Sequence, residues 1–591
     1  MKFKFLLIAV NAKYIHSNPA IYSLRAYAKE AGRQYVELAE YTINQSMQEI
    51  LADIYRRKPS VIGFSCYIWN WRIIQELLVE LPKVLPHIPI YLGGPEVSYD
   101  PEVILLQYPW LAGIMIGEGE ETFQELLDYY VEAMPCNLTD IKGLYLPSGY
   151  TPFRPLTNMN HIPFLYDTLE PFENKIIYYE TSRGCPYSCS YCLSSIEKAV
   201  RLRDMDIVKK ELQFFLDHKV KQVKFVDRTF NCNHSHAMAI WQFIYDHDNG
   251  VTNFHFEISA DILKADEIAL LRRFRPGLAQ LEIGVQSVNG HTLEAIKRVM
   301  NVDKLEQAVA ALQEGKNLHL HLDLIAGLPY EDYDSFKISF QRVYGLRPEQ
   351  LQLGFLKVLK GSQMWERADE YGIQYMSRPP YEVLSTRWLS YDEILRLKSI
   401  EEMVELYYNS AQFTHTLPFL EKAFPDSFTM YEALADFYRQ KGYGVISPAR
   451  IQRYQILLEF AAQYDGARKA IYQELLTYDM YLRENLKSRP DFASELSEWK
   501  EAIKEFYRKE EKERQFLPEY VGYDWKQLSK MTHLEPFLYP VWDMEQMVSG
   551  YDAWGDGTVL NSTEQGKQKD FILFDYQQRN PLNYEAKVRH I

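Results

Sequence analysis

The chain has 591 residues, of which 47% are hydrophobic and 25% charged, and its formal net charge is −15. Because a single hydrophobic core rarely exceeds about 250 to 300 residues, this length predicts several domains, and the composition excludes a disordered chain. The acidic balance argues against a general nucleic-acid surface, which would show clustered basic residues.

The sequence contains no run of about 18 apolar residues, the length that a membrane-spanning helix needs. The apolar residues 3–10 are followed by no A-x-A-like cleavage site, so we expect a buried first strand and not a signal peptide. Six cysteines, most of them far apart, do not form a disulfide scaffold. These features together predict a cytoplasmic protein.

Residues 1–135 alternate short apolar runs with amphipathic stretches. The predicted strands are residues 3–10, 35–41, 61–66, 88–92 and 112–116, and helical patterns follow at residues 46–57 and 120–133. Repeated strand–helix units predict an α/β fold with an open, doubly wound parallel sheet of the flavodoxin type. Such sheets bind ligands beyond the carboxyl ends of their strands.

Small and polar residues follow these predicted strands. They are Ser65 after the third strand, Gly93 and Gly94 after the fourth, and Gly117, Glu118 and Gly119 after the fifth. Glycine lets a bulky ligand approach the backbone closely, although each of these glycines is equally compatible with an ordinary turn.

Residues 136–172 contain five prolines and read as a linker with one small hairpin. A strand at residues 175–181 then leads to Cys185, Cys189 and Cys192, a CxxxCxxC spacing that Arg183 and Gly184 precede. Thiolates suit iron–sulfur clusters or zinc, and three of them leave one metal position open for a ligand. The alternatives are a zinc knuckle that lacks a ligand, or three buried cysteines without a function.

Polar and apolar residues alternate in three later strands, at residues 254–259, 281–286 and 319–324. A period of two places the polar residues of each strand on one side. They are His255, Glu257 and Ser259, then Glu282, Gly284 and Gln286, and then His319, His321 and Asp323. A closed eight-stranded barrel has an apolar interior, so residues 173–365 are predicted to form an incomplete (β/α)6 barrel around a wet cavity. The alternative is the exposed face of an edge sheet.

Residues 366–591 are predicted to form a mainly α-helical C-terminal domain, with long helices at residues 392–408 and 492–516. Strands are expected at residues 558–560 and 571–574. The remaining cysteines, Cys66, Cys136 and Cys232, stand alone, and none follows Cys232, so this domain cannot build a second cluster.

The CxxxCxxC motif, together with the Gly-Gly-Pro at residues 93–95 and the Gly-Glu-Gly-Glu at residues 117–120, resembles the cobalamin-dependent radical S-adenosylmethionine family. The resemblance covers residues 1–365, and residues 378–384 resemble the start of an uncharacterised C-terminal domain found on one branch. It implies cobalamin in residues 1–135, and a [4Fe-4S] cluster on the three cysteines that binds S-adenosylmethionine.

The resemblance also implies roles for single residues. Asp227 matches a segment that contacts the methionine part of S-adenosylmethionine, Glu257 and Ser259 match ribose contacts, and Gly284 and Gln286 lie in segments near the adenosyl group. The cobalamin contacts implied are Ser65, Gly93, Gly94, Gly117, Glu118 and Gly119.

The D-x-H-x-x-G motif that supplies an axial histidine in other cobalamin proteins is absent. The nearest candidate, His16, is expected to be a helix-entry residue, so cobalt is expected without a protein histidine on its lower face.

The activity implied is methylation of an unactivated carbon after reductive cleavage of S-adenosylmethionine. Radical cyclisation or rearrangement, a non-catalytic cobalamin-binding protein and a zinc-stabilised binding protein remain alternatives. No catalytic residue is assigned. The expected partners are an external electron donor such as flavodoxin or ferredoxin, and a substrate that is a small molecule or peptide in preference to nucleic acid.

Overall fold

The computed structural model describes residues 3–30, 34–132, 134, 137–166, 168–444, 448–555 and 570–591. Its chain divides into two compact units. The first comprises Met1–Leu318, Ile325–Asp332 and Gly354–Tyr391, and the second comprises His319–Leu324, Tyr333–Leu353 and Asp392–Ile591. Cys136 and the strand predicted at residues 558–560 lie outside the described residues.

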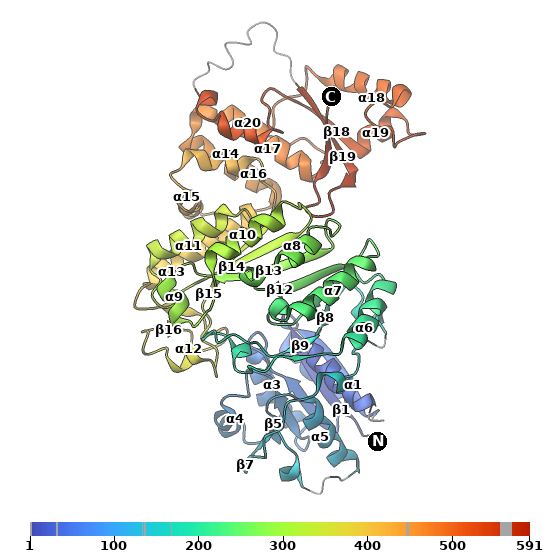
Figure 1. The fold of residues 1–591 in the computed structure, drawn as a ribbon, viewed down its shortest axis with the longest axis vertical. Helices are drawn as coiled ribbons and strands as arrows, with labels where there is room; N and C mark the ends of the chain where they lie inside the picture. Colours follow the sequence, from blue (N-terminus) through green and yellow to red (C-terminus); the bar gives the residue numbers. More distant parts are fainter. Residues whose placement is uncertain are drawn as a thin grey trace. The chain divides into compact units, whose positions relative to one another are not determined.

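The first sheet has seven strands in the order β2-β1-β3-β4-β5-β6-β7 (Figure 1). Its strands are β1 Phe5–Asn11, β2 Val36–Thr42, β3 Val61–Ser65, β4 Ile90–Gly93, β5 Gly113–Met115, β6 Leu144–Leu146 and β7 Gly149–Tyr150. Strands β1 to β5 are parallel, whereas β6 and β7 form an antiparallel hairpin on β5. The order 2-1-3-4-5 is that of flavodoxin-like folds, and it confirms the predicted doubly wound sheet.

Helices cover both faces of this sheet. They are α1 Pro19–Glu30, α2 Met47–Arg57, α3 Trp71–Val84, α4 Pro101–Gln107 and α5 Glu120–Glu132. Helix α1 packs on α5, and α2 packs on α3. Strand β1 is buried along its whole length, because it lies inside the sheet between β2 and β3, and helices cover both faces of the sheet.

The second sheet has the strand order β15-β14-β13-β12-β11-β8. Its strands are β8 Ile177–Tyr179, β11 Gln222–Phe225, β12 Asn253–Ile258, β13 Ala279–Gln286, β14 His319–Ala326 and β15 Gln350–Phe355. The pairs β8–β11, β11–β12 and β12–β13 are parallel. Because β8 and β15 are edges, six strands form an open sheet, as the incomplete barrel requires.

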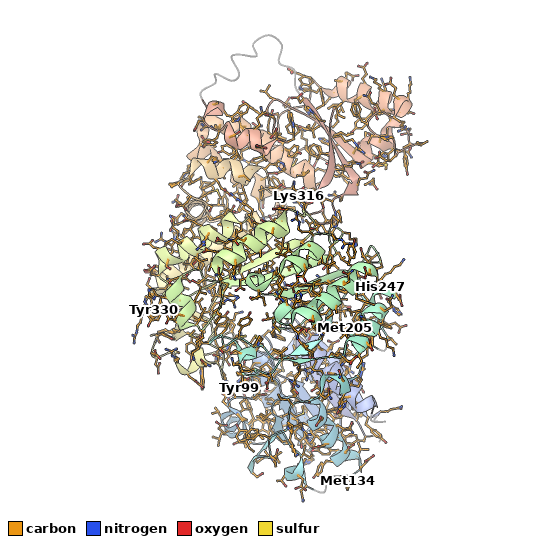
Figure 2. The ribbon with its side chains drawn as sticks, viewed as in Figure 1. Tyr99, Met134, Met205, His247, Lys316 and Tyr330 are labelled. Atoms are coloured by element: carbon orange, nitrogen blue, oxygen red, sulfur yellow. The ribbon has the colours of Figure 1, made fainter. Side chains whose placement is uncertain are left out.

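Helices between these strands are α6 Met205–Asp217, α7 His234–Asp246, α8 Ala265–Leu271, α9 Gly290–Ala295, α10 Val302–Gln313 and α11 Tyr333–Gly345. Short elements complete the first unit: β9 Ser182–Arg183, β10 Arg201–Leu202, α12 Gln363–Glu366, β16 Gln374–Tyr375 and β17 Val383–Ser385. Residues 354–391 contact the first domain, since the ring of Tyr99, which Figure 2 labels, lies against Gly361. Lys360 also pairs with Asp100 at 2.8 Å.

The second unit is mainly helical, as predicted. Besides α11, its helices are α13 Tyr391–Met403, α14 Thr416–Leu420, α15 Ser427–Lys441, α16 Arg450–Tyr464, α17 Lys469–Arg483, α18 Lys500–Glu513, α19 Trp525–Met531 and α20 Met544–Ser549. An antiparallel sheet joins β18 Thr532–Phe537, β19 Asp570–Arg579 and β20 Ala586–His590. Among the described helices, none combines the length and the apolar character needed to cross a bilayer.

The predicted helix at residues 492–516 is wrong over its first eight residues, because α18 begins at Lys500. The preceding chain is fixed by tertiary contacts: Gln473 donates a hydrogen bond to the Phe492 carbonyl at 2.6 Å. The helix predicted at residues 392–408 is confirmed, with Val404–Asn409 continuing α13 as a π-helix.

Candidate functional site

The cysteine loop is the closed end of a two-stranded hairpin. Strands β9 and β10 are antiparallel, with Arg183 directly opposite Arg201, so the connecting residues 184–200 carry all three motif cysteines. Within the loop, the Cys185 N–H donates to the Glu197 carbonyl at 2.9 Å. Gly184 has φ +95°, and a Cβ there would collide with the Ala199 carbonyl oxygen. Glycine is therefore required where the hairpin closes.

The strand end before the hairpin is held by Asp227, which follows β11. Its carboxylate accepts hydrogen bonds from the Thr181 N–H at 3.0 Å, the Thr181 hydroxyl at 2.6 Å and the Ser182 hydroxyl at 2.6 Å. Burial raises the pKa of the Asp227 carboxyl, and the hydrogen bonds from Ser182 and Thr181 oppose that rise. The structure thus gives Asp227 contacts within the protein, and its contact with S-adenosylmethionine stays a prediction.

A buried arginine lies against the thiols. The Arg298 guanidinium approaches the Cys189 sulfur at 3.8 Å and the Tyr191 hydroxyl at 3.4 Å, and it also donates to the Gly284 carbonyl. Burial raises the pKa of the Cys189 thiol, whereas the Arg298 charge opposes that shift. A guanidinium here stabilises thiolate character in the loop.

The spacing of the motif sulfurs differs from that around a bound tetrahedral zinc ion. Tetrahedral zinc with Zn–S bonds of about 2.3 Å places thiolates about 3.8 Å apart. Across the residues that the structure describes, the triplet of metal-ligand side chains whose donor atoms all lie within 4.8 Å is His234, Asp266 and Glu267, not the three cysteines. The three motif sulfurs therefore do not all lie within 4.8 Å of one another.

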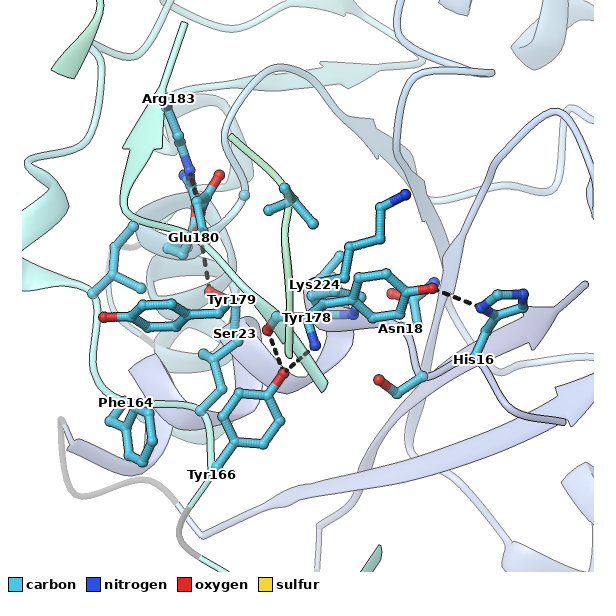
Figure 3. A pocket seen from close by; sticks show the side chains of 18 of the residues that line it. His16, Asn18, Ser23, Phe164, Tyr166, Tyr178, Tyr179, Glu180, Arg183 and Lys224 are labelled. Carbon is cyan, nitrogen blue, oxygen red and sulfur yellow. Dashed lines mark hydrogen bonds and ion pairs between the residues drawn. The ribbon is translucent and has the colours of Figure 1, made fainter. Parts of the chain in front are cut away.

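A cavity of about 680 Å³ lies in the first unit, between its two sheets. One wall comes from the loops after β1 and β3, including His16, Asn18, Tyr67 and Trp69. This is the topological switch point of the first sheet, where parallel α/β sheets bind ligands. Figure 3 shows the opposite wall, in which Tyr178, Tyr179, Glu180 and Arg183 follow one another from β8 toward the cysteine hairpin.

The polar strand faces meet in one charged network. Glu282 accepts hydrogen bonds from His255 at 2.8 Å and from Lys224 at 3.0 Å, and Glu257 lies 4.0 Å from Lys224 and 3.7 Å from Arg228. Lys224, Arg228 and Glu257 line the cavity. Of the polar residues predicted on β12, Glu257 therefore faces this cavity, and Lys224 and Arg228, for which no orientation was predicted, lie beside it.

The predicted site residues fall into three groups. Glu118, Gly119 and Glu257 line the cavity. Gly284 and Gln286 lie beside Arg298, since the Gly284 carbonyl accepts a hydrogen bond from Arg298 and a Cβ at Gly284 would collide with the Gln286 amide nitrogen. Ser259 donates a hydrogen bond to Asp261 at 2.8 Å, and its side chain also influences the pKa of Tyr187 in the cysteine loop. The others serve contacts between loops or face open space: Ser65 bonds Asn18, Gly93 lies against Met115, Gly94 lies against Cys66, and a Cβ added at Gly117 would have no atom within 4 Å.

Gly94 has φ +110°, and a Cβ there would lie 2.5 Å from the Cys66 carbonyl oxygen. Its glycine is therefore explained by the close approach of the loops after β3 and β4. Whether Ser65, Gly93, Gly94 and Gly117 also contact a ligand stays a prediction.

His16 precedes α1, and its side chain lines the cavity (Figure 3). Its Nδ1 lies 2.6 Å from the Tyr178 hydroxyl. Burial lowers the pKa of the imidazole, and the neighbouring charges of Lys13 and Lys224 lower it further. These effects favour the neutral imidazole, and the contact between His16 and Tyr178 joins the two sheets of the first unit.

Sequence reasoning missed Arg298, Arg201, Tyr178 and Glu180. Arg298 stands alone after α9, outside any motif, and nothing in its local pattern distinguishes it from a surface arginine. Glu180 was detectable in principle, because it directly follows β8 and precedes the cysteine motif.

The chain carries a B12-binding domain followed by a radical SAM domain, as matches to domain models show. Residues 6–127 match the model of the B12 binding domain, and residues 179–343 match that of the Radical SAM superfamily. Residues 369–553 match DUF4080, a protein domain of unknown function.

Two characterised relatives are similar in sequence. The chain is 25% identical over 432 residues to the cobalamin-dependent radical SAM methyltransferase TokK of Streptomyces tokunonensis, covering 64% of this chain and 62% of that protein. It is 28% identical over 348 residues to the 2-(S-pantetheinyl)-carbapenam-3-carboxylate methyltransferase of Streptantibioticus cattleyicolor, covering 53% and 49%. The alignments thus span less than two thirds of either relative.

Among solved structures, the radical S-adenosylmethionine methyltransferase TsrM from Kitasatospora setae, with cobalamin and a [4Fe-4S] cluster bound, matches with a TM-score of 0.55. The match covers 65% of this chain and 82% of that chain at 16% identity, so it concerns the fold.

Proposed function

We propose that this protein is a cobalamin-dependent radical SAM methyltransferase, acting on an unactivated carbon of a small molecule or peptide. One observation carries the proposal: a single cavity is lined both by the switch point of the B12-binding domain and by the strand end that leads into the cysteine hairpin. The methyltransferase relatives support the choice of methyl transfer over cyclisation or rearrangement.

The residues present fit the cofactors that this function needs. Cys185, Cys189 and Cys192 supply three thiolates on one loop, a donor set that leaves one iron of a [4Fe-4S] cluster open. The switch-point loops offer a cavity to a corrin. When bound, these cofactors and S-adenosylmethionine supply the reductive cleavage, hydrogen abstraction and methyl transfer.

The chain's own residues bind and orient the cofactors and the substrate, and they exclude water. Arg298 places a buried cation beside Cys189, where it attracts the carboxylate of an amino acid. Glu257 presents a carboxylate to the cavity, which suits ribose hydroxyls as donors. Aromatic side chains of the cavity wall, including Tyr67, Trp69 and Tyr178, exclude water from the reaction space.

An external one-electron donor such as flavodoxin or ferredoxin completes the proposal, since the cluster must be reduced before each cleavage. The oxygen-sensitive thiolate site fits a reducing cytoplasm.

The test is anaerobic purification followed by reconstitution with iron, sulfide and hydroxocobalamin. We expect about four irons and four sulfides per chain and one corrinoid per chain, with the iron lost in a variant that replaces all three motif cysteines by alanine. Bound zinc without iron, or a chain that takes up no corrinoid, would contradict the proposal.

A further inference from the structure

Resting on the proposed function, we infer that Glu118 and Glu120 are positioning residues: they bind the two arginines that close the cysteine hairpin and so couple cobalamin binding to the cluster site. Glu118 lies in the loop between β5 and α5, and Glu120 is the first residue of α5. Both belong to the Gly-Glu-Gly-Glu segment whose resemblance implied a direct cobalamin contact.

Glu118 bridges the two strands of the hairpin. Arg201 on β10 binds it through both terminal nitrogens, with Nη1 at 3.1 Å, and Arg183 on β9 lies 3.5 Å away. Because Arg183 and Arg201 are paired residues of the two strands, one carboxylate holds both ends of the loop that carries the cysteines.

Glu120 holds the same hairpin from a second side. It accepts a hydrogen bond from Arg183 at 2.6 Å and one from the Ser23 hydroxyl at 3.0 Å, and its side chain is only 5% exposed. Arg183 also binds Glu180 at 2.9 Å. A buried ion pair is costly to break from one side, since the remaining charge loses its partner in a poorly solvated place.

An acidic residue at the start of a helix has an ordinary explanation, because it favours the helix dipole, and this applies to Glu120. It does not apply to Glu118, which precedes α5. Burial would raise the pKa of the Glu118 carboxyl, but Arg201, the Thr157 N–H and Arg183 hold it below its usual value. Glu118 therefore favours its negatively charged form where it binds the two hairpin arginines.

The coupling between cobalamin binding and the cluster site follows because these residues also line the cavity. Glu118, Gly119, Glu120 and Arg183 all line the cavity at the switch point. A corrin in that cavity contacts the residues that hold the hairpin, and an ordered hairpin in turn fixes one wall of the cavity. Coupling between two sites is reciprocal, and its usual size is about 5- to 150-fold in affinity.

The experiment compares hydroxocobalamin dissociation constants, measured by anaerobic absorbance titration of the full chain with and without its reconstituted cluster. For the wild type we expect binding at least about fivefold tighter when the cluster is present. In Glu118→Gln, the dissociation constants measured with and without the cluster should become equal, while the variant still binds cobalamin and iron.

The matched control is Glu121→Gln, which removes a carboxylate of the same helix that pairs with Arg154 at 3.0 Å and does not touch the hairpin. It should keep the wild-type ratio. Arg201→Gln removes the same ion pair from the arginine side and should also bring the ratio of the two dissociation constants near one. This second variant keeps the inference testable if Glu118→Gln fails to fold.

A wild-type ratio of one, or a Glu118→Gln ratio equal to the wild type, overturns the inference and leaves the proposed function standing. A wild type that binds no cobalamin or assembles no cluster overturns both.

Discussion

Glu282 on β13 is a partly buried carboxylate of the polar strand faces that accepts hydrogen bonds from His255 and Lys224. Burial alone would raise its pKa, but the hydrogen bond from His255 and the charge of Lys224 lower it to about 2. A carboxyl whose folded pKa is depressed stabilises the folded state above its unfolded pKa of 4.5, and that contribution is lost as the pH falls toward 2.

Glu282→Gln therefore lowers the free energy of unfolding by up to about 3 kcal/mol at neutral pH, and by less in acid. We expect the difference in urea midpoint between wild type and variant, measured on the cluster-free protein, to narrow between about pH 6 and pH 3.5. Glu314→Gln, at an exposed ion pair with Arg272, should differ little from the wild type at either pH. A difference for Glu282 that widens in acid would contradict this account.

At the residue scale, the sequence predicts which side of a strand a residue occupies but not its partner. The period of two placed His255 and Glu257 on one face, and the structure agrees. Lys224 of β11 and Glu282 of β13 meet only through the strand order, and Arg298 reaches Cys189 from an element more than a hundred residues away. Such contacts have no local signal.

The cysteine hairpin is the element that positions the proposed chemistry, and Gly184 is its tightest point. An alanine there combines φ +95° with a collision against the Ala199 backbone, so the hairpin must open. Gly250 has a similar φ of +74°, but no atom lies within 4 Å of an added Cβ.

Alanine at either glycine strains the backbone, but only alanine at Gly184 also collides with the Ala199 backbone. Comparing the two variants therefore distinguishes the effect of strain from the effect of that contact. We expect Gly184→Ala to retain less than about a tenth of the wild-type iron after reconstitution, whereas Gly250→Ala costs about 1 kcal/mol of stability and keeps its iron. Equal iron content in the two variants would show that the Gly184 contact is not needed.

Helices and strands were predicted correctly where a strongly periodic segment belongs to a repeated strand–helix unit. The parallel strands whose ranges were predicted were found with their ends shifted by at most two residues, because each is an apolar run between helices. No range was predicted for β11 or β15. Strands β18 and β20 were missed, since Pro536 in β18 and the charged residues of β20 hide their alternation. The capping box of Ser46 and Glu49 explains why α2 was placed well.

At the scale of the whole molecule, the second unit shares elements with the barrel. Helix α11 packs on α15, where the rings of Phe340 and Phe428 lie 5.3 Å apart and those of Tyr344 and Tyr431 lie 5.7 Å apart. Lys337 pairs with Asp426 at 2.9 Å. The C-terminal helices thus cover an apolar face of a helix that the sequence assigned to residues 173–365.

A chain that ends at residue 391 leaves that face of α11 exposed to water. We expect it to elute as aggregates in size-exclusion chromatography, while the full chain, prepared in the same way, elutes as a defined species. A monodisperse truncated protein with the iron and corrinoid content of the full chain would contradict the packing described for α11.

The most direct test of the account is the 5′-deoxyadenosine formed when the reconstituted, reduced protein is mixed with S-adenosylmethionine under anaerobic conditions. We predict at least one equivalent per chain in the wild type and none in Cys192→Ser, which loses one of the three thiolates. A wild-type protein that holds about four irons per chain and yet releases no 5′-deoxyadenosine would contradict the account.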